Sequence, residues 1–222
     1  NIELIRAGID RRLFRPIDRD KAVRETGIDF DNVILFVGRI TKAKGLRILV
    51  KALANVKEEF KEDVKLLVIG GDVSGVMHSE QEEREKRKLK ELLGELNLEE
   101  NVEFLGPVER EELPYYYSLA DVCAVPSMYE TFGLVAVEAM ACGVPVVASK
   151  VGGLKHTVKE GYSGLHFIPG RADLLADSLL KLLTDSKKMR KMRNNARERA
   201  AMEFSLERTV RQIKELYDAL LF

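Results

Sequence analysis

The sequence predicts an α/β domain in which a parallel β-sheet is covered by helices on both faces. Short segments that are apolar almost throughout alternate along the chain with longer segments of helical periodicity. The apolar segments lack the polar–apolar alternation of a half-exposed strand, so they indicate strands that are buried on both faces. The chain has 222 residues, of which 45% are hydrophobic and 32% charged. This size and composition suit one large α/β domain or two small ones.

Short apolar segments are predicted to form the strands. In chain order they are residues 33–37, 64–69, 102–105, 122–125, 144–148 and 164–168. Helical periodicity predicts the helices between them, which are residues 46–60, 80–96, 111–118 and a helix that starts at Gly133. From residue 172 the chain is predicted to be helical, with amphipathic segments at 173–183, 187–201 and 206–221 and with Ser205 as the N-cap of the last.

In parallel sheets of this kind, ligands bind beyond the carboxyl ends of the strands. Glycine-bearing segments follow several of the predicted strands, namely Gly38-Arg39, Gly70-Gly71, Gly106 and residues 130–133. We therefore expect these segments to cluster at one rim of the sheet and to form the functional site.

Composition excludes several classes of function. Lys plus Arg and Asp plus Glu both number 36, so no overall charge attracts nucleic acid or anionic lipid. No apolar run is long enough to span a membrane and no signal-peptide pattern is visible, so a cytoplasmic location is expected. Cys123 and Cys142 lie in apolar runs and are predicted to be buried free thiols. His78, His156 and His166 lack ligand spacing, so no metal site is expected.

Two motifs follow the first two strands. In residues 37–45, Gly38 allows close approach of a ligand, and Arg39 and Lys44 are cations suited to phosphate. This is not a Walker A loop, and two cations before a helix are more often ordinary solvated residues. In residues 69–75 the glycines lack the dinucleotide-binding fingerprint, so a plain turn and a ligand loop around Gly71 stay equally open.

The most informative motif joins Glu130 to Glu138. Glu138 is the only charged residue between Thr131 and Ser149, so it is expected to be largely buried and to need a partner. Backbone N–H groups at the start of its helix favour an anion, and Glu138 leans back toward that end, where a ribose diol could donate two hydrogen bonds to it. The alternatives are a structural ion pair of Glu138 with an arginine and a solvated loop carboxylate at Glu130.

Together these residues resemble the donor-binding domain of family 4 retaining glycosyltransferases, which have the GT-B fold. The resemblance covers the chain from about residue 2 to its end, and its most specific part is the Glu-x7-Glu block. Nearest to it is the branch with sucrose synthases, sucrose-phosphate synthases and mycothiol-pathway glycosyltransferases, on the evidence of the loop at 71–79 and of residues 151–154. The matching segments are Val37-Gly-Arg39, Lys44-Gly45, Phe104-Leu-Gly106, Ala120-Asp121, Pro126-Ser127, 130–134, 138–148 and Val151-Gly-Gly153. The chain departs from the family pattern at residues 5–10 and at Lys155-His156.

The resemblance implies a single carboxyl-terminal half of a GT-B fold, with a Rossmann-like sheet and a helical tail. Residues 1–10 would be the remnant of an interdomain linker, and residues 11–204 would be the nucleotide-sugar-binding domain. Residues 205–222 would form a helix that packs toward a missing amino-terminal domain, where the acceptor binds. The isolated domain is then expected to bind the donor and to be inactive alone.

The resemblance also implies a nucleotide-diphosphate sugar donor, with UDP favoured over ADP or GDP, and a hexosyl group such as glucose. Arg39 and Lys44 would hold the diphosphate and Glu130 the sugar, and these three are the expected catalytic residues. Glu138 would bind the ribose, and Leu105 with the residues just after it would meet the base. The remaining donor-binding residues would be Gly38, Gly71, Thr131, Phe132, Gly133 and Leu134. No cofactor and no obligatory metal are expected.

Other functions are alternatives to this one. A nucleotide-sugar epimerase of the same GT-B fold could also use carboxylates and a diphosphate site, and a non-catalytic nucleotide-sugar-binding module also stays open. An interaction module that kept only the fold would have no need of the whole set Arg39, Lys44, Glu130 and Glu138. A dinucleotide-dependent dehydrogenase would require the glycine fingerprint that the chain lacks.

Overall fold

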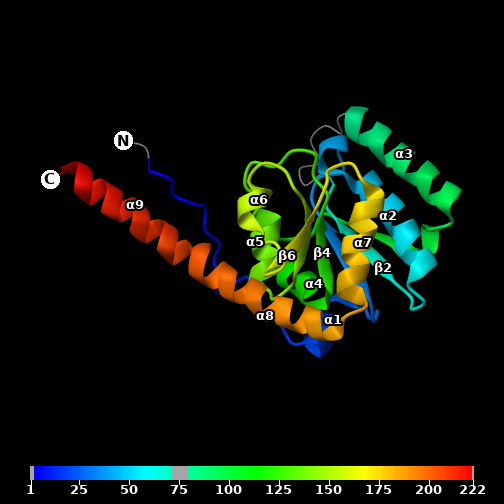
Figure 1. Cartoon of the computed structure of the whole chain (residues 1–222), viewed down its shortest axis with the longest axis horizontal. Coiled ribbons are helices and arrows are strands. Elements are labelled where there is room, and N and C mark those ends of the chain that lie inside the picture. The colour runs from blue at the N-terminus through cyan, green and yellow to red at the C-terminus, as the bar shows by residue number, and fades with distance from the viewer. Residues whose placement is uncertain (1–2, 72–79, 222) are drawn as a thin grey trace.

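The computed structural model describes residues 3–71 and 80–221, and it confirms the predicted parallel sheet (Figure 1). The strand order is β3-β2-β1-β4-β5-β6, and every neighbouring pair is parallel. The chain therefore builds outward from β1 in one direction and then outward from β4 in the other. The strands are β1 (Val33–Val37), β2 (Lys65–Ile69), β3 (Val102–Gly106), β4 (Val122–Val125), β5 (Val146–Ser149) and β6 (Gly164–Phe167).

Most helices begin and end within two residues of their predicted limits. The helices are α1 (Arg19–Thr26), α2 (Leu46–Glu59), α3 (Glu80–Leu96), α4 (Leu113–Leu119), α5 (Leu134–Ala141), α6 (Leu154–Thr157), α7 (Ala172–Leu183), α8 (Ser186–Glu203) and α9 (Leu206–Leu221), with 3-10 turns η1 (Lys42–Lys44) and η2 (Glu99–Asn101).

Two helices were not predicted, and β5 is the strand that differs most from its predicted limits, the others differing by one residue at most. Helix α1 was not predicted, because Ala22 is its only buried residue and its sequence carries no apolar periodicity. Helix α6 is a single turn, which is too short to show a period. Strand β5 begins at Val146 rather than at residue 144, because Pro145 has no N–H group to donate to the ladder.

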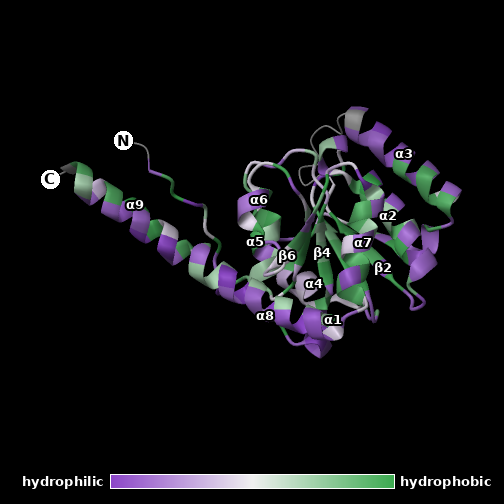
Figure 2. Ribbon diagram, viewed as in Figure 1, coloured by the Kyte–Doolittle hydropathy of each residue, from purple (hydrophilic) through white to green (hydrophobic). Residues whose placement is uncertain are grey.

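Both faces of the sheet are buried, which explains the continuous apolar strands. In β1, Ile34 and Phe36 pack with α2, α3 and α7, whereas Val33 and Leu35 pack with α1, α4 and α5. Figure 2 shows the hydrophobic strands enclosed between helices whose hydrophilic residues lie outside. In the described part of the chain no helix is both long and apolar enough to cross a membrane.

Asp121 joins three elements at the amino end of the sheet, on the side away from the predicted site. Its Oδ2 accepts a hydrogen bond from the backbone N–H of Val33 at 2.9 Å, and its Oδ1 accepts one from Arg193 of α8 at 2.9 Å. Arg193 also donates to the carbonyl of Ala120 at 2.9 Å. The Ala120-Asp121 pair of the resemblance therefore has a structural role.

Helix α9 projects away from the rest of the molecule, together with the amino-terminal segment (Figure 1). Ser205 caps it as predicted, because the Ser205 hydroxyl accepts from the N–H of Arg208 at 3.3 Å. Ile9 bonds to the backbone on both sides of Ser205, since its N–H donates to Phe204 at 2.9 Å and its carbonyl accepts from Leu206 at 3.0 Å. One face of α9 exposes large apolar side chains, which are Leu206, Val210, Ile213, Tyr217 and Leu220.

Replacing Asp121 by alanine is expected to lower the free energy of unfolding by about 2–3 kcal/mol, because it leaves the buried N–H group of Val33 without its acceptor and removes the carboxylate that pairs with Arg193. Urea denaturation measures this loss. The control is Asp173→Ala, which removes a carboxylate from the exposed pair with Arg171 and should leave the urea midpoint close to that of the unmodified protein. Equal losses in the two variants would contradict the structural role of Asp121.

Candidate functional site

The topology places a crevice between the carboxyl ends of β1 and β4. These strands are neighbours in the sheet, but the chain leaves β1 toward β2 and leaves β4 toward β5. The loops that follow them therefore diverge, and ligands bind at such switch points in α/β sheets. The loop after β1 carries Gly38 and Arg39, and the loop after β4 carries residues 126–133.

The turn after β1 packs directly against the loop after β4. The N–H of Met128 donates to the carbonyl of Ala43 at 2.7 Å. A Cβ atom at Gly45 would lie 2.0 Å from the carbonyl oxygen of Pro126. No residue larger than glycine fits at position 45. The backbone of the η1 turn and of Gly45 therefore contacts the backbone of the loop after β4 directly.

The loop after β4 is held from its other side by residues 151–157. The N–H of Gly153 donates to the carbonyl of Glu130 at 3.0 Å, and the Thr157 hydroxyl donates to the carbonyl of Phe132 at 2.7 Å. A Cβ atom at Gly153 would lie 2.2 Å from the carbonyl oxygen of Thr131. The Val151-Gly-Gly153 run of the resemblance is thus explained by packing against the loop that carries Glu130.

The structure joins Lys44 and Glu130 as an ion pair across this contact. Lys44 Nζ lies 2.7 Å from Glu130 Oε2, and their side chains are 29% and 16% exposed. The predicted roles assigned these two residues to the diphosphate and to the sugar, and here they bind each other. Arg39 is exposed, and within residues 3–71 and 80–221 its side chain has no hydrogen-bonding or ionic partner. A phosphate could therefore bind Arg39 without displacing any protein group.

Helix α5 starts beside this ion pair with unpaired amides. Gly133 precedes the helix with φ 87°, and its carbonyl accepts from Ala136 and Val137. Among the described residues, the N–H groups of Phe132, Gly133 and Leu134 have no acceptor, as expected for the first turn of a helix. The start of α5 therefore presents donors and the positive end of a helix dipole beside Glu130.

Glu138 lies one turn further along α5 and is 9% exposed. The Tyr117 hydroxyl of α4 donates to Glu138 Oε2 at 3.1 Å. Burial raises the pKa of Glu138, while the Tyr117 hydrogen bond and the charge of Arg110 act in the opposite direction. Across the described part of the chain no arginine forms an ion pair with Glu138, so its polar partner is Tyr117 rather than the arginine considered as an alternative.

Sequence reasoning missed Tyr117. The run Tyr115-Tyr-Tyr117 carries three equivalent hydroxyls, and only the fold shows which of them reaches α5. No signal in the sequence separates Tyr117 from its two neighbours as the partner of Glu138.

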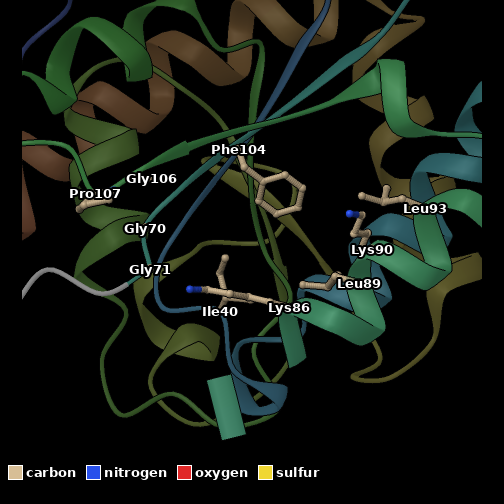
Figure 3. Close-up of a pocket in the computed structure, with 10 residues that line it drawn as sticks. All are labelled: Ile40, Gly70, Gly71, Lys86, Leu89, Lys90, Leu93, Phe104, Gly106 and Pro107. Atoms are coloured by element: carbon tan, nitrogen blue, oxygen red, sulfur yellow. The ribbon is translucent and has the colours of Figure 1, made fainter. Parts of the chain in front are cut away.

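A cavity of about 510 Å³ lies at the carboxyl ends of β2 and β3 (Figure 3). Figure 3 shows the backbone of three glycines, Gly70, Gly71 and Gly106, on the side away from α3. Ile40, Phe104, Pro107 and side chains of α3, including Lys86 and Lys90, line the remainder. Residues 72–79 follow Gly71 and lie outside the described residues. They include most of the predicted loop at 69–75 and of the loop at 71–79.

The side chain of Leu105 does not line this cavity. It is half-buried and packs with the apolar cluster on the other face of the sheet, because successive strand residues point to opposite faces. Gly106 and Pro107, the next two residues, do line the cavity. Contact of a ligand with this strand end would therefore involve residues after Leu105 more than the leucine side chain.

The other predicted positions are placed as follows. Thr131 is exposed and Phe132 is half-buried, with its ring 5.8 Å from that of Phe204 in an edge-to-face arrangement. Cys123 and Cys142 are buried and unpaired, as predicted. Among the described residues no group of three or more His, Cys, Asp or Glu side chains is arranged to hold a metal ion.

A parallel sheet covered by helices on both faces, with a crevice at its switch point, defines a Rossmann-like α/β domain of the ligand-binding type. Residues 18–199 match the family described as Glycosyl transferases group 1, so the chain belongs to that family. The resemblance predicted from the sequence is thereby confirmed.

Three proteins of known name are similar to this chain. The chain is 39% identical over 224 residues to the D-inositol 3-phosphate glycosyltransferase of Corynebacterium urealyticum, covering 99% of this chain and 51% of that protein. Sucrose-phosphate synthase of Thermosynechococcus elongatus superimposes with a TM-score of 0.85 at 37% identity, covering 99% of this chain and 52% of that one. Anabaena Alr3699/HepE, solved in complex with UDP, superimposes with a TM-score of 0.87 at 30% identity, covering 98% of this chain and 57% of that one. The chain thus spans about half the length of these relatives.

Replacing Gly153 by alanine is expected to lower the free energy of unfolding by about 1–3 kcal/mol, because the new Cβ has only backbone to displace. That Cβ would lie 2.2 Å from the Thr131 carbonyl oxygen and 2.7 Å from Phe132 Cα. Gly94→Ala in α3 is the control, since its Cβ would meet only a glutamate side chain at 3.4 Å. The control should stabilise the protein by about 0.5–1 kcal/mol in the same thermal or urea unfolding experiment.

Proposed function

We propose that this domain binds the nucleotide-diphosphate sugar donor of a retaining hexosyltransferase, with UDP-glucose as the favoured donor. The observation that carries the proposal is the Lys44–Glu130 ion pair beside three unpaired amides at the switch point, with Arg39 on the same loop as Lys44. The sequence match to group 1 glycosyl transferases favours sugar transfer over the epimerase alternative.

The diphosphate would bind between Arg39 and Lys44. Its negative charges would compete with Glu130 for Lys44 Nζ, and a partly exposed ion pair is a weak competitor. Lys44 would then turn to phosphate and Glu130 would be released toward the hydroxyls of the sugar. As the bond between the sugar and the diphosphate breaks, the two cations would stabilise the charge that develops on the leaving group, with no metal ion required.

The start of α5 would bind the distal phosphate and the sugar. Three unpaired amides and the helix dipole favour an anion at Phe132, Gly133 and Leu134. Glu138 would be repelled by phosphate but suits a ribose, whose hydroxyls can donate to a carboxylate. Because side chains lean toward the start of their helix, Glu138 is directed toward the same end of α5 as the amides.

The base would bind at the strand ends beside Gly70, Gly71 and Gly106, where the cavity of about 510 Å³ lies. Uracil is favoured because the Anabaena protein is solved with UDP, and related structures of it hold UDP-glucose or UDP with glucose. Adenine and guanine are the alternatives that a binding experiment separates.

We further propose that residues 3–8 and α9 lie against a second domain that precedes this one and binds the acceptor. The exposed apolar face of α9 supports this, as does the half-length coverage of the relatives. Residues 11–204 would then be the donor-binding unit, inactive in transfer by itself. We also propose a cytoplasmic location, since Cys123 and Cys142 are unpaired, as is usual for proteins in a reducing compartment.

Titration calorimetry with UDP, ADP and GDP tests donor binding. UDP is expected to bind most tightly, and Arg39→Ala should weaken its binding about tenfold or more, because a charge-assisted hydrogen bond to phosphate is lost. The matched control is Lys42→Ala, which removes an exposed cation from the neighbouring η1 turn and should change the affinity little. A folded protein that binds none of the three nucleotides would show the proposal to be wrong.

Hydrogen exchange tests the proposed second domain. In the chain of residues 1–222, the amides of residues 210–220 are expected to exchange rapidly, because α9 has few contacts there. In a protein that includes the preceding domain they should exchange at least about tenfold more slowly, since packing would suppress local opening. Amides of α5 serve as the internal reference, and identical α9 exchange in both proteins would exclude the contact.

A further inference from the structure

Tyr117 and Glu138 form a buried polar pair between α4 and α5. The Tyr117 side chain is fully buried, and its hydroxyl donates to Glu138 Oε2 at 3.1 Å. We propose that Tyr117 is a positioning residue, which holds one carboxylate oxygen of Glu138 so that the other faces the ribose of the donor. This inference rests on the proposed function, because it takes the ribose to be the ligand of Glu138.

The surroundings of Tyr117 fix its ring. Phe14 packs edge-to-face against it, with ring centroids 6.2 Å apart and planes at 68°, and the Arg110 guanidinium lies 5.4 Å from the Phe14 ring centre. A buried hydroxyl without a partner is unfavourable, and Glu138 is the acceptor that Tyr117 finds within the described residues. The ring and the carboxylate therefore hold each other in one orientation.

The use of the two carboxylate oxygens distinguishes Glu138 from Asp121 and Glu203, two carboxylates that link elements of the fold. Asp121 has both oxygens bound, one to Val33 N–H and one to Arg193. Glu203 likewise binds Arg199 through Oε1 and Arg6 through Oε2, each at 2.7 Å. Glu138 binds Tyr117 through Oε2 only, and its Oε1 has no partner in the described part of the chain.

A nearly buried carboxylate with one oxygen held and one unpaired suits a ligand that donates hydrogen bonds. An ionised carboxylate has about four acceptor sites, so it can accept from Tyr117 and from a diol together. Burial favours the protonated acid, and a protonated oxygen would lose acceptor sites. The Tyr117 hydrogen bond acts against burial by lowering the pKa of Glu138, and it also orients the carboxylate.

The experiment compares the affinities of the chain for UDP and for 2′-deoxy-UDP by titration calorimetry. The unmodified protein is expected to prefer UDP about tenfold, which corresponds to one hydrogen bond to a charged group. Tyr117→Phe should reduce this preference to about twofold or less, and Glu138→Ala should abolish it. Tyr116→Phe is the matched control, because it removes the hydroxyl of the neighbouring half-buried tyrosine and should keep the preference.

The outcomes separate the positioning role from the proposed function. If the unmodified protein binds UDP without preferring it to 2′-deoxy-UDP, the ribose role of Glu138 fails, and the positioning role fails with it. If the preference exists and Tyr117→Phe keeps it in full, only the positioning role is wrong. A loss of affinity that is equal for both nucleotides shows a merely structural tyrosine and also overturns the inference.

A second measurement keeps the inference testable should Tyr117→Phe not fold. The ¹⁹F resonance of 3-fluorotyrosine at position 117 reports on the hydroxyl without removing it. Saturating UDP is expected to shift this resonance, and saturating 2′-deoxy-UDP to shift it much less. Equal shifts with the two nucleotides overturn the positioning role.

Discussion

The arrangement of the site depends on backbone contacts that leave no room for a Cβ atom. Residues 126–133 are held on one side by Gly45 and on the other by Gly152 and Gly153, each of which would place a Cβ atom within 2.2 Å of a carbonyl oxygen of this loop. Backbone-to-backbone packing fixes a loop more closely than side chains with rotatable bonds can. The position of Glu130, the direction of α5 and the depth of Glu138 all follow from where this loop is held.

The held loop brings opposite charges together without a ligand. Lys44 and Glu130 lie 86 residues apart in sequence and 2.7 Å apart in space. Their pairing satisfies both charges. In the proposed function a diphosphate would bind Lys44 and a sugar hydroxyl would bind Glu130. Under that function, binding of the donor would exchange the side-chain partners of Lys44 and Glu130.

Much of the fold could be predicted because the burial of each strand and helix is visible in its own local pattern of apolar residues. Strand β1 is apolar at every position because both of its faces are buried. Helix α5 follows Gly133, whose φ of 87° is a backbone conformation that favours glycine. Helix α1 escaped prediction because it buries a single alanine, and no local pattern marks such a helix. At the site, the composition of each loop was readable, but two pairings were not. Lys44 with Glu130 and Tyr117 with Glu138 are set by tertiary packing, and many other lysines and tyrosines have the same local sequence character.

The bridge between Ile9 and Ser205 has a mechanical consequence. Two segments distant in sequence enter and leave the domain at one place, tied by hydrogen bonds to Phe204 and Leu206. If a second domain precedes this one as proposed, the two segments would join it to this domain at a single place, so the two domains would swing about that place more than they translate. The described part of residues 10–204 packs on one sheet, so a swing about Ile9 would change what faces the crevice and leave its walls in place.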